Sequence, residues 1–250
     1  MIEQSENGNV TILTLAHGKA NTLDIEFCEA LVARFEQLRT SPARAVVLTG
    51  RAKIFSAGVD LVRLAGDGTD YIRKFLPALH RLYDAVYFFP KPVVAAVNGH
   101  AIAGGCVLAC CADMRVMARV SGRIGVTELL VGVPFPVLAF EIMRAVTTPR
   151  FFPQAILSGA TQPPDAAIER GFIDEIAEPA ALMQRALELA QTLAALSPPA
   201  FAMAKRQIRQ PVSERLLLSQ AIEEEVTEIW TRPETLARIR DYVARTFKKS

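Results

Sequence analysis

The stretch PVVAAVNGHAIAGGC, Pro92–Cys106, joins a short apolar run to a segment of small residues. Val93–Val97 has the length and composition of a buried β-strand. The segment 98–106 follows it with three glycines, so the chain can turn tightly there and begin a helix. Backbone N–H groups at such a helix start have no partner within the helix, and they suit an oxygen that carries negative charge.

A second segment of the same kind lies upstream. Phe55–Leu61 reads FSAGVDL and follows the apolar run Ala45–Thr49. A single glycine turn would be unremarkable, because glycine is an ordinary turn residue. Two such segments, each placed after a predicted strand, predict one site formed by two loops. Asp60 is expected to cap the turn that follows the first loop.

The rest of the first half alternates strands with helices. Val10–Leu15 and Met114–Ala118 are further predicted strands, and Asp24–Leu38 and Asp70–Phe89 are predicted helices. Strands separated by helices need crossover connections, so the sequence predicts an α/β layer fold.

From Leu138 onward the pattern is almost entirely helical. Ser197-Pro198-Pro199 and Arg232-Pro233 are sharp helix boundaries. We therefore expect a core domain over 1–195 and a C-terminal helical region over 196–250, packed on the core or on a neighbouring subunit. The predicted helices are Leu138–Val146, Arg150–Leu157, Pro163–Arg170, Ala180–Ala195, Pro198–Ile208, Glu214–Trp230 and Glu234–Phe247.

Composition excludes several classes of protein. A formal charge of +2 gives no global field for nucleic acid or an anionic membrane, and neither is an expected partner. The start of the chain has no secretory pattern, and no apolar run is long enough to span a bilayer. The four cysteines do not resemble a disulfide framework, which favours the cytoplasm. Scattered histidines and crowded cysteines give no set of metal ligands.

Taken in order, these segments resemble the crotonase superfamily, also called the enoyl-CoA hydratase/isomerase family. Cys111-Ala112-Asp113, Ile124–Glu128, Leu157-Ser158-Gly159 and Ala166–Ile176 fit it as well, so the resemblance covers almost the whole chain. It implies a crotonase-like spiral of ββα units followed by a C-terminal helical region, and a homotrimer or a dimer of trimers. The implied substrate is an acyl-CoA, in fatty acid metabolism, with no separate cofactor because coenzyme A is part of the substrate.

The resemblance also implies the catalytic groups. The backbone N–H groups of Val59 and Gly104 would form an oxyanion hole for the thioester oxygen. Hydratases of the family use two glutamates; the first position aligns with Val107, which transfers no proton, and the second with Glu128. One carboxylate favours isomerisation of a β,γ-enoyl-CoA to the α,β-enoyl-CoA, with Glu128 moving the proton. A hydratase, an acyl-CoA hydrolase and a non-catalytic acyl-CoA-binding protein remain alternatives.

Substrate contacts carried over from the family lie in four segments. The residues expected to bind substrate are Lys19, Ala20, Ala57, Gly58, Asp60, Leu61, Gly105, Val107, Pro134 and Phe135. Coenzyme A carries phosphates, so cations are expected near it. Arg63, just after the first loop, is a further candidate for that contact. Arg240, Lys248 and Lys249 are expected to reach the coenzyme A of a neighbouring subunit if the C-terminal helix packs there.

Overall fold

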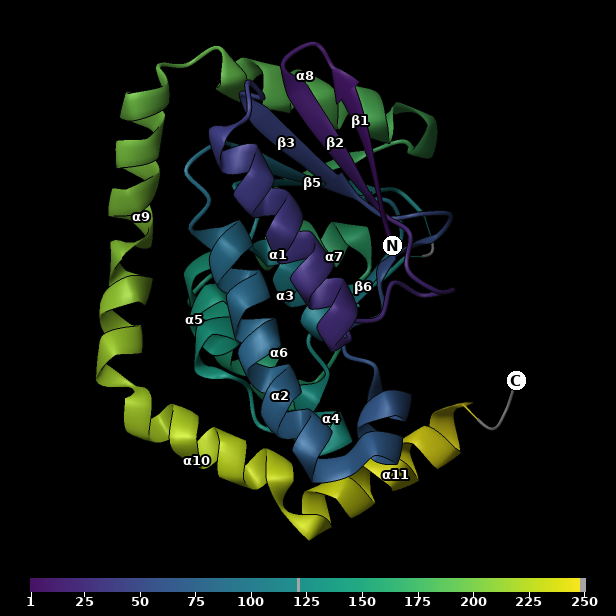
Figure 1. Cartoon of the computed structure of the whole chain (residues 1–250). Helices are drawn as coiled ribbons and strands as arrows, with labels where there is room; N and C mark the ends of the chain where they lie inside the picture. The colour runs from purple at the N-terminus through teal and green to yellow at the C-terminus, as the bar shows by residue number, and fades with distance from the viewer. Residues whose placement is uncertain (121, 248–250) are drawn as a thin grey trace.

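A computed structural model describes residues 1–120 and 122–247 of the chain (Figure 1). The chain begins with a hairpin in which β1 (Ile2–Asn7) pairs antiparallel with β2 (Val10–Leu15). Strand β1 was not expected, because its sequence, IEQSEN, is polar; all of it beyond Ile2 is exposed. A charged strand is typical of a sheet edge, where it discourages pairing with other chains.

The main sheet has six strands in the order β1-β2-β3-β5-β7-β9. From β2 onward the pairs are parallel, through β3 (Ala45–Thr49), β5 (Val93–Val97), β7 (Met114–Ala118) and β9 (Glu175–Ala177). Every residue of β3 and β5 is buried, as expected for parallel strands covered on both faces. The prediction of an almost wholly helical second half missed β9, a three-residue strand.

A smaller sheet gives the fold its spiral. It contains β4 (Ile54–Ser56), β6 (His100–Ile102) and β8 (Ile124–Gly125), all parallel. Each of these strands follows a strand of the main sheet and precedes a helix: α2 (Leu61–Tyr87), α3 (Gly104–Cys110) or α4 (Glu128–Val131). The three repeats are ββα units, so the predicted fold class is confirmed. As a result, three strand-to-helix loops leave the small sheet side by side.

Helix α2 starts earlier than predicted. The sequence pattern predicted Asp70–Phe89, but the helix begins at Leu61, where the Asp60 side chain accepts a hydrogen bond from the Arg63 N–H and caps it as expected. Gly68 interrupts the helix with φ 73°, so the first two turns bend away from the rest. Two glycines, Gly66 and Gly68, weakened the helical pattern over this part of the sequence. Helix α1 (Ile25–Thr40) is capped by Asp24 in the same way.

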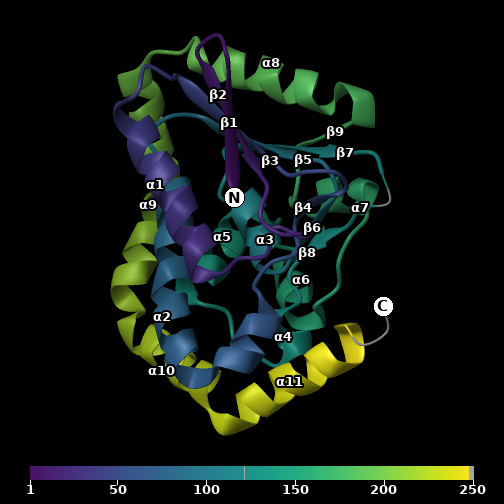
Figure 2. The same cartoon turned by 45° about the vertical axis from the view of Figure 1, so that its right-hand side comes forward.

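The second half of the chain wraps around these layers (Figures 1 and 2). Small helices α5 (Val137–Val146), α6 (Phe152–Ser158) and α7 (Pro164–Glu169) precede β9 and a short 3₁₀ turn, Pro179–Ala181. Helix α8 (Leu182–Ala194) then covers one face of the main sheet, opposite α1, α2 and α3. Its buried residues are Leu182, Ala186, Ala190 and Ala194, and the three alanines allow the helix to approach the sheet closely.

Three helices complete the chain: α9 (Pro198–Leu218), α10 (Gln220–Thr231) and α11 (Pro233–Phe247). The predicted break between Ile208 and Glu214 is wrong, since α9 continues through Pro211. Its buried cations Lys205 and Arg209 hold it to the core through Asp113, at 2.7 and 2.6 Å. Helix α8 ends just before residue 195, but the division into 1–195 and 196–250 stays a prediction. No helix among the described residues is long and apolar enough to cross a membrane.

Candidate active site

The first loop joins β4 to α2 and leaves one backbone donor free. Gly58 has φ 85°, which turns the chain sharply. Its own N–H donates to Ser56 Oγ at 3.1 Å, and the Asp60 N–H donates to the Leu23 carbonyl at 3.0 Å. The Val59 N–H between them has no hydrogen-bond partner in the described part of the chain.

The second loop joins β6 to α3 in a related way. Ala103 has φ 50°, a value that strains a residue with a side chain. Its N–H donates to the Gly125 carbonyl at 2.8 Å, whereas the N–H of Gly104, the first residue of α3, finds no partner within residues 1–120 or 122–247. The hydrogen bond to Gly125 holds Ala103 in this backbone conformation, and the Ala103 carbonyl in turn accepts from the Cys106 N–H. The Gly104 N–H between them stays free.

The two loops lie against each other. A Cβ atom on Gly104 would be 3.4 Å from Val59 Cγ2 and 2.8 Å from the hydroxyl of Tyr83, which donates to the Gly104 carbonyl at 3.1 Å. A Cβ on Gly58 would be 3.0 Å from the Gly104 nitrogen. Any side chain at these two glycines would therefore crowd the free donors.

A cavity of about 550 Å³ opens beside these loops. Of the residues predicted to form the site, those lining it are Ala20, Ala57, Val59, Asp60, Leu61, Gly104 and Glu128. The sequence did not point to Tyr83, Trp230 and Tyr242 as members of this wall. Their spacing is that of ordinary core residues, and only the tertiary fold brings α2, α10 and α11 to one cavity.

Six predicted residues do not line the cavity: Lys19, Gly58, Gly105, Val107, Pro134 and Phe135. Gly58 acts through its backbone turn. Gly105 is needed for close packing, because a Cβ there would lie 2.3 Å from the Ser56 carbonyl oxygen. Val107 is fully buried in the core.

Pro134, Phe135 and Lys19 lie around the cavity rather than in its wall. The Pro134 carbonyl accepts a hydrogen bond from Trp230 Nε1 at 2.9 Å. Phe135 packs edge-on against Phe140, with ring centroids 6.2 Å apart. Lys19 is exposed in the turn next to Ala20, which does line the cavity.

Glu128 is the buried acid of the cavity. It is the first residue of α4 and only 9% exposed. Its Oε2 atom has no hydrogen-bond partner in the described structure. Burial raises the pKa of Glu128 from its ordinary 4.5 to about 7, and nearby backbone N–H groups of Glu128 and Thr127 lower it by less. A carboxylate with this pKa can both take up and release a proton near neutral pH.

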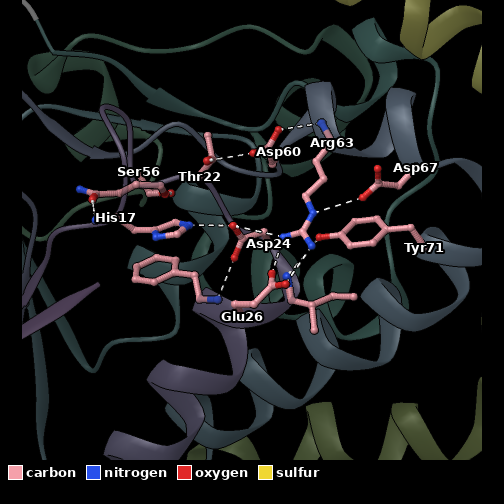
Figure 3. Close-up of polar contacts among 12 residues, drawn as sticks. His17, Thr22, Asp24, Glu26, Ser56, Asp60, Arg63, Asp67 and Tyr71 are labelled. Atoms are coloured by element: carbon pink, nitrogen blue, oxygen red, sulfur yellow. Dashed lines mark hydrogen bonds and ion pairs between the residues drawn. The ribbon is translucent and has the colours of Figure 1, made fainter.

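The mouth of the cavity carries a polar cluster, drawn in Figure 3. Arg63 lines the cavity, and it forms ion pairs with Asp24 at 3.7 Å, with Asp67 at 3.3 Å and with Glu26. Its guanidinium also lies over the Tyr71 ring, 4.7 Å from the centroid. Surrounded by three carboxylates, Arg63 has no surplus charge for a phosphate.

The other candidate cations are placed differently. Arg240, on α11, donates from Nε to the Ala65 carbonyl at 3.1 Å, so it ties α11 to the first turns of α2. Lys248 and Lys249 lie outside the described residues. Within the described chain, no three His, Cys, Asp or Glu side chains are arranged to hold a metal ion.

Comparison with proteins of known name shows the family of the chain. A profile of the family described as enoyl-CoA hydratase/isomerase matches residues 5–236. A putative enoyl-CoA hydratase of Thermus thermophilus is 35% identical over 207 residues, which is 81% of each chain. Human mitochondrial enoyl-CoA delta isomerase 1 is 26% identical over 220 residues, 87% of this chain and 73% of that protein.

Solved structures agree on the architecture. The crystal structure of human mitochondrial delta3-delta2-enoyl-CoA isomerase matches with a TM-score of 0.94 at 24% identity, over 100% of this chain and 99% of that one. A Mycobacterium tuberculosis structure described as an enoyl-CoA isomerase matches at 0.79 and 30% identity, over 96% and 97% of the two chains.

The ββα spiral and the two loops that leave its smaller sheet define an α/β enzyme of the crotonase superfamily. Both the profile and the relatives point to one family within that class. The chain belongs to the enoyl-CoA hydratase/isomerase family.

Proposed function

We propose that the chain isomerises a β,γ-enoyl-CoA to the α,β-enoyl-CoA with Glu128 as its single base. One observation carries this proposal: the carboxylate of Glu128, whose Oε2 atom has no hydrogen-bond partner in the described structure, shares a mostly apolar cavity with the free N–H groups of Val59 and Gly104. Asp60 is the other carboxylate in the described cavity wall, and it accepts a hydrogen bond from the Arg63 N–H as the cap of α2. The substrate brings its coenzyme A with it, so no separate cofactor is proposed.

The proposed reaction moves one proton and two electron pairs. Glu128 removes a proton from the α carbon, and the electron pair of that C–H bond delocalises onto the thioester oxygen. The N–H groups of Val59 and Gly104 stabilise the negative oxygen; removing one such donor typically costs about 3–4 kcal/mol of transition-state stabilisation. The protonated Glu128 then returns the proton to the γ carbon, and the double bond shifts to the α,β position.

Hydration is the second candidate, because the Thermus thermophilus relative is named a putative hydratase. A hydratase must position water and also protonate the α carbon, which is easier with two carboxylates. Val107, at the position of the other family glutamate, is apolar and lies outside the cavity wall. This arrangement favours the isomerase.

We also propose which residue contacts coenzyme A, the compartment of the protein and its assembly. Exposed Lys19 lies beside cavity residue Ala20 and is proposed to meet the coenzyme A moiety, whereas Arg63 is not. The four cysteines are free and buried, which supports a reducing compartment such as the cytoplasm. A homotrimer or a dimer of trimers stays the proposed assembly.

Glu128→Gln tests the proposal. The variant should still bind enoyl-CoA but convert a β,γ-enoyl-CoA at least about a hundredfold more slowly, because a positioned general base contributes that much or more. Glu141→Gln is the matched control: Glu141 is also buried, at 5% exposure, but lies on α5 outside the cavity wall. Products are identified by mass spectrometry.

Four results would contradict the isomerase. An unchanged rate in Glu128→Gln would remove Glu128 from the chemistry. A 3-hydroxyacyl-CoA from the wild-type protein would indicate a hydratase, and a free acid would indicate a hydrolase. Tight binding of every enoyl-CoA without conversion would point to a binding protein.

A further inference from the structure

The cavity changes character from its mouth to its buried end. At the mouth, Val62 is 58% exposed, and Asp60 and Arg63 bring charge. At the buried end, Leu79 is 2% and Val131 5% exposed. A ligand that enters beside Val62, Asp60 and Arg63 and reaches the buried residues therefore meets a more apolar wall.

Trp230 is another buried residue of the cavity wall, although it belongs to α10 in the C-terminal helical region. It is 2% exposed and lines the cavity. Its only polar atom, Nε1, donates to the Pro134 carbonyl at 2.9 Å, which fixes the orientation of the indole. Val226, Leu236 and Ile239 belong to the same buried cluster and support the helix behind it. A large, fixed aromatic ring is well suited to form a wall that does not move.

The chemistry of this end selects an apolar ligand. Its other buried walls include Val133, Pro136 and Ala139, which offer no hydrogen bond from a side chain. The Tyr83 hydroxyl is taken up by the Gly104 carbonyl. A charged or hydroxylated acyl end would lose its water there without gaining partners, and that is unfavourable. An unbranched aliphatic chain loses nothing and buries its apolar surface.

We propose that Trp230 is the end wall of an acyl-chain pocket, and that it limits the length of the unbranched aliphatic acyl group that the site accepts. This inference rests on the proposed function only in taking the ligand to be an acyl-CoA. Helix α10 folds back on α2 and α5 (Figure 2). Through Trp230 it would then close the acyl pocket of its own chain.

The test measures binding rather than turnover. Saturated straight-chain acyl-CoA thioesters, from butanoyl-CoA to tetradecanoyl-CoA, are titrated into the wild-type protein by isothermal calorimetry. Affinity should rise about fourfold for each added methylene, the value expected for its burial, up to a chain length at which the rise stops. In Trp230→Leu the rise should continue to longer chains, and shorter chains should bind as in the wild type.

Two further variants keep the test decisive. Val226→Ala is the matched control, since Val226 is buried one turn earlier on α10 but does not line the cavity; its length limit should be that of the wild type. Ala139→Met adds bulk at the same end from α5 and should move the limit to shorter chains, which tests the pocket even if Trp230→Leu fails to fold.

The inference is overturned if Trp230→Leu and the wild type stop at the same chain length, if Val226→Ala shifts the limit as much, or if a cationic acyl-CoA binds more tightly than an aliphatic one of equal length. Because saturated thioesters cannot be isomerised, these outcomes are independent of the proposed reaction. If the wild type binds no acyl-CoA of any length, the proposed function itself fails.

Discussion

At the scale of single residues, Glu128 stands out because it is buried in a mostly apolar cavity, where its charged form is unfavourable. An unpartnered carboxylate in an apolar cavity destabilises a folded protein unless it is protonated. The nearby free N–H groups of Val59 and Gly104 form no bonds of their own in the described structure. Groups that are left unsatisfied in this way are typical of a site arranged for a ligand rather than for stability.

A pH-dependent stability follows from Glu128. Burial raises its pKa in the folded state to about 7, from 4.5. Between these values the folded state binds more protons than the unfolded state, so the free energy of unfolding falls as pH rises through this window. The Glu128→Gln variant has no titrating group at this position, so it does not lose this stability. The free energy of unfolding of the variant minus that of the wild type should therefore be on the order of 3 kcal/mol larger at about pH 8 than at about pH 4.

Urea denaturation of both proteins at a series of pH values measures this difference, with Glu141→Gln again as the control. In the same window the wild-type kcat/KM should rise with pH and level off above about pH 7, because the base must be ionised to accept a proton. A stability difference that does not change with pH would mean that Glu128 is solvated in the folded protein.

At the scale of elements, the long strands and the glycine loops follow from local sequence. The predicted strands Val10–Leu15, Ala45–Thr49, Val93–Val97 and Met114–Ala118 have the same bounds in the structure. They are continuous or alternating apolar runs that must be buried. Strands β4, β6 and β8 have two or three residues each, too few for a pattern, and they exist because the repeats pair with one another. Sequence reasoning also missed Trp230 and Tyr83, since residues that line a cavity and residues that fill a core have the same composition.

The bend in α2 gives a prediction at this scale. Gly66 and Gly68 both have open space where a Cβ would be, but only Gly68 has a positive φ, 73°. Gly66→Ala should therefore stabilise the protein by up to about 1 kcal/mol, because alanine favours the helix and restricts the unfolded chain. Gly68→Ala should destabilise it by about 1–3 kcal/mol, because φ 73° with ψ −156° is a backbone conformation that essentially only glycine adopts. Thermal unfolding of the two variants and the wild type measures both effects. Equal changes of the same sign would mean that the bend at Gly68 does not persist in solution.

At the scale of the whole molecule, the C-terminal helices both complete the cavity and present an apolar corner. Leu217 and Leu218 at the end of α9 are 82% and 86% exposed, and Ile222 at the start of α10 is 56% exposed. Exposed apolar groups that gather in one place are typical of an interface between chains. Their position fits an interface between chains, and a homotrimer or a dimer of trimers stays the proposed assembly.

Light scattering after size-exclusion chromatography should therefore give three or six times the mass of one chain. Replacing Leu217 and Leu218 together with lysine should lower that mass, because charge at a buried interface is unfavourable. Met203→Lys is a useful comparison, since Met203 is 47% exposed on α9 but lies about four turns earlier. A wild-type protein that elutes with the mass of one chain would contradict the assembly.

In the proposed reaction, one glutamate moves one proton within a mostly apolar cavity. The most direct test is to mix the purified protein with a β,γ-enoyl-CoA in deuterated water and to follow the products by mass spectrometry and NMR. We expect an α,β-enoyl-CoA to which no water has been added. Deuterium that enters this product should be at the γ carbon. A product with oxygen on the β carbon and deuterium on the α carbon would contradict it, because that product requires water to be activated at this site.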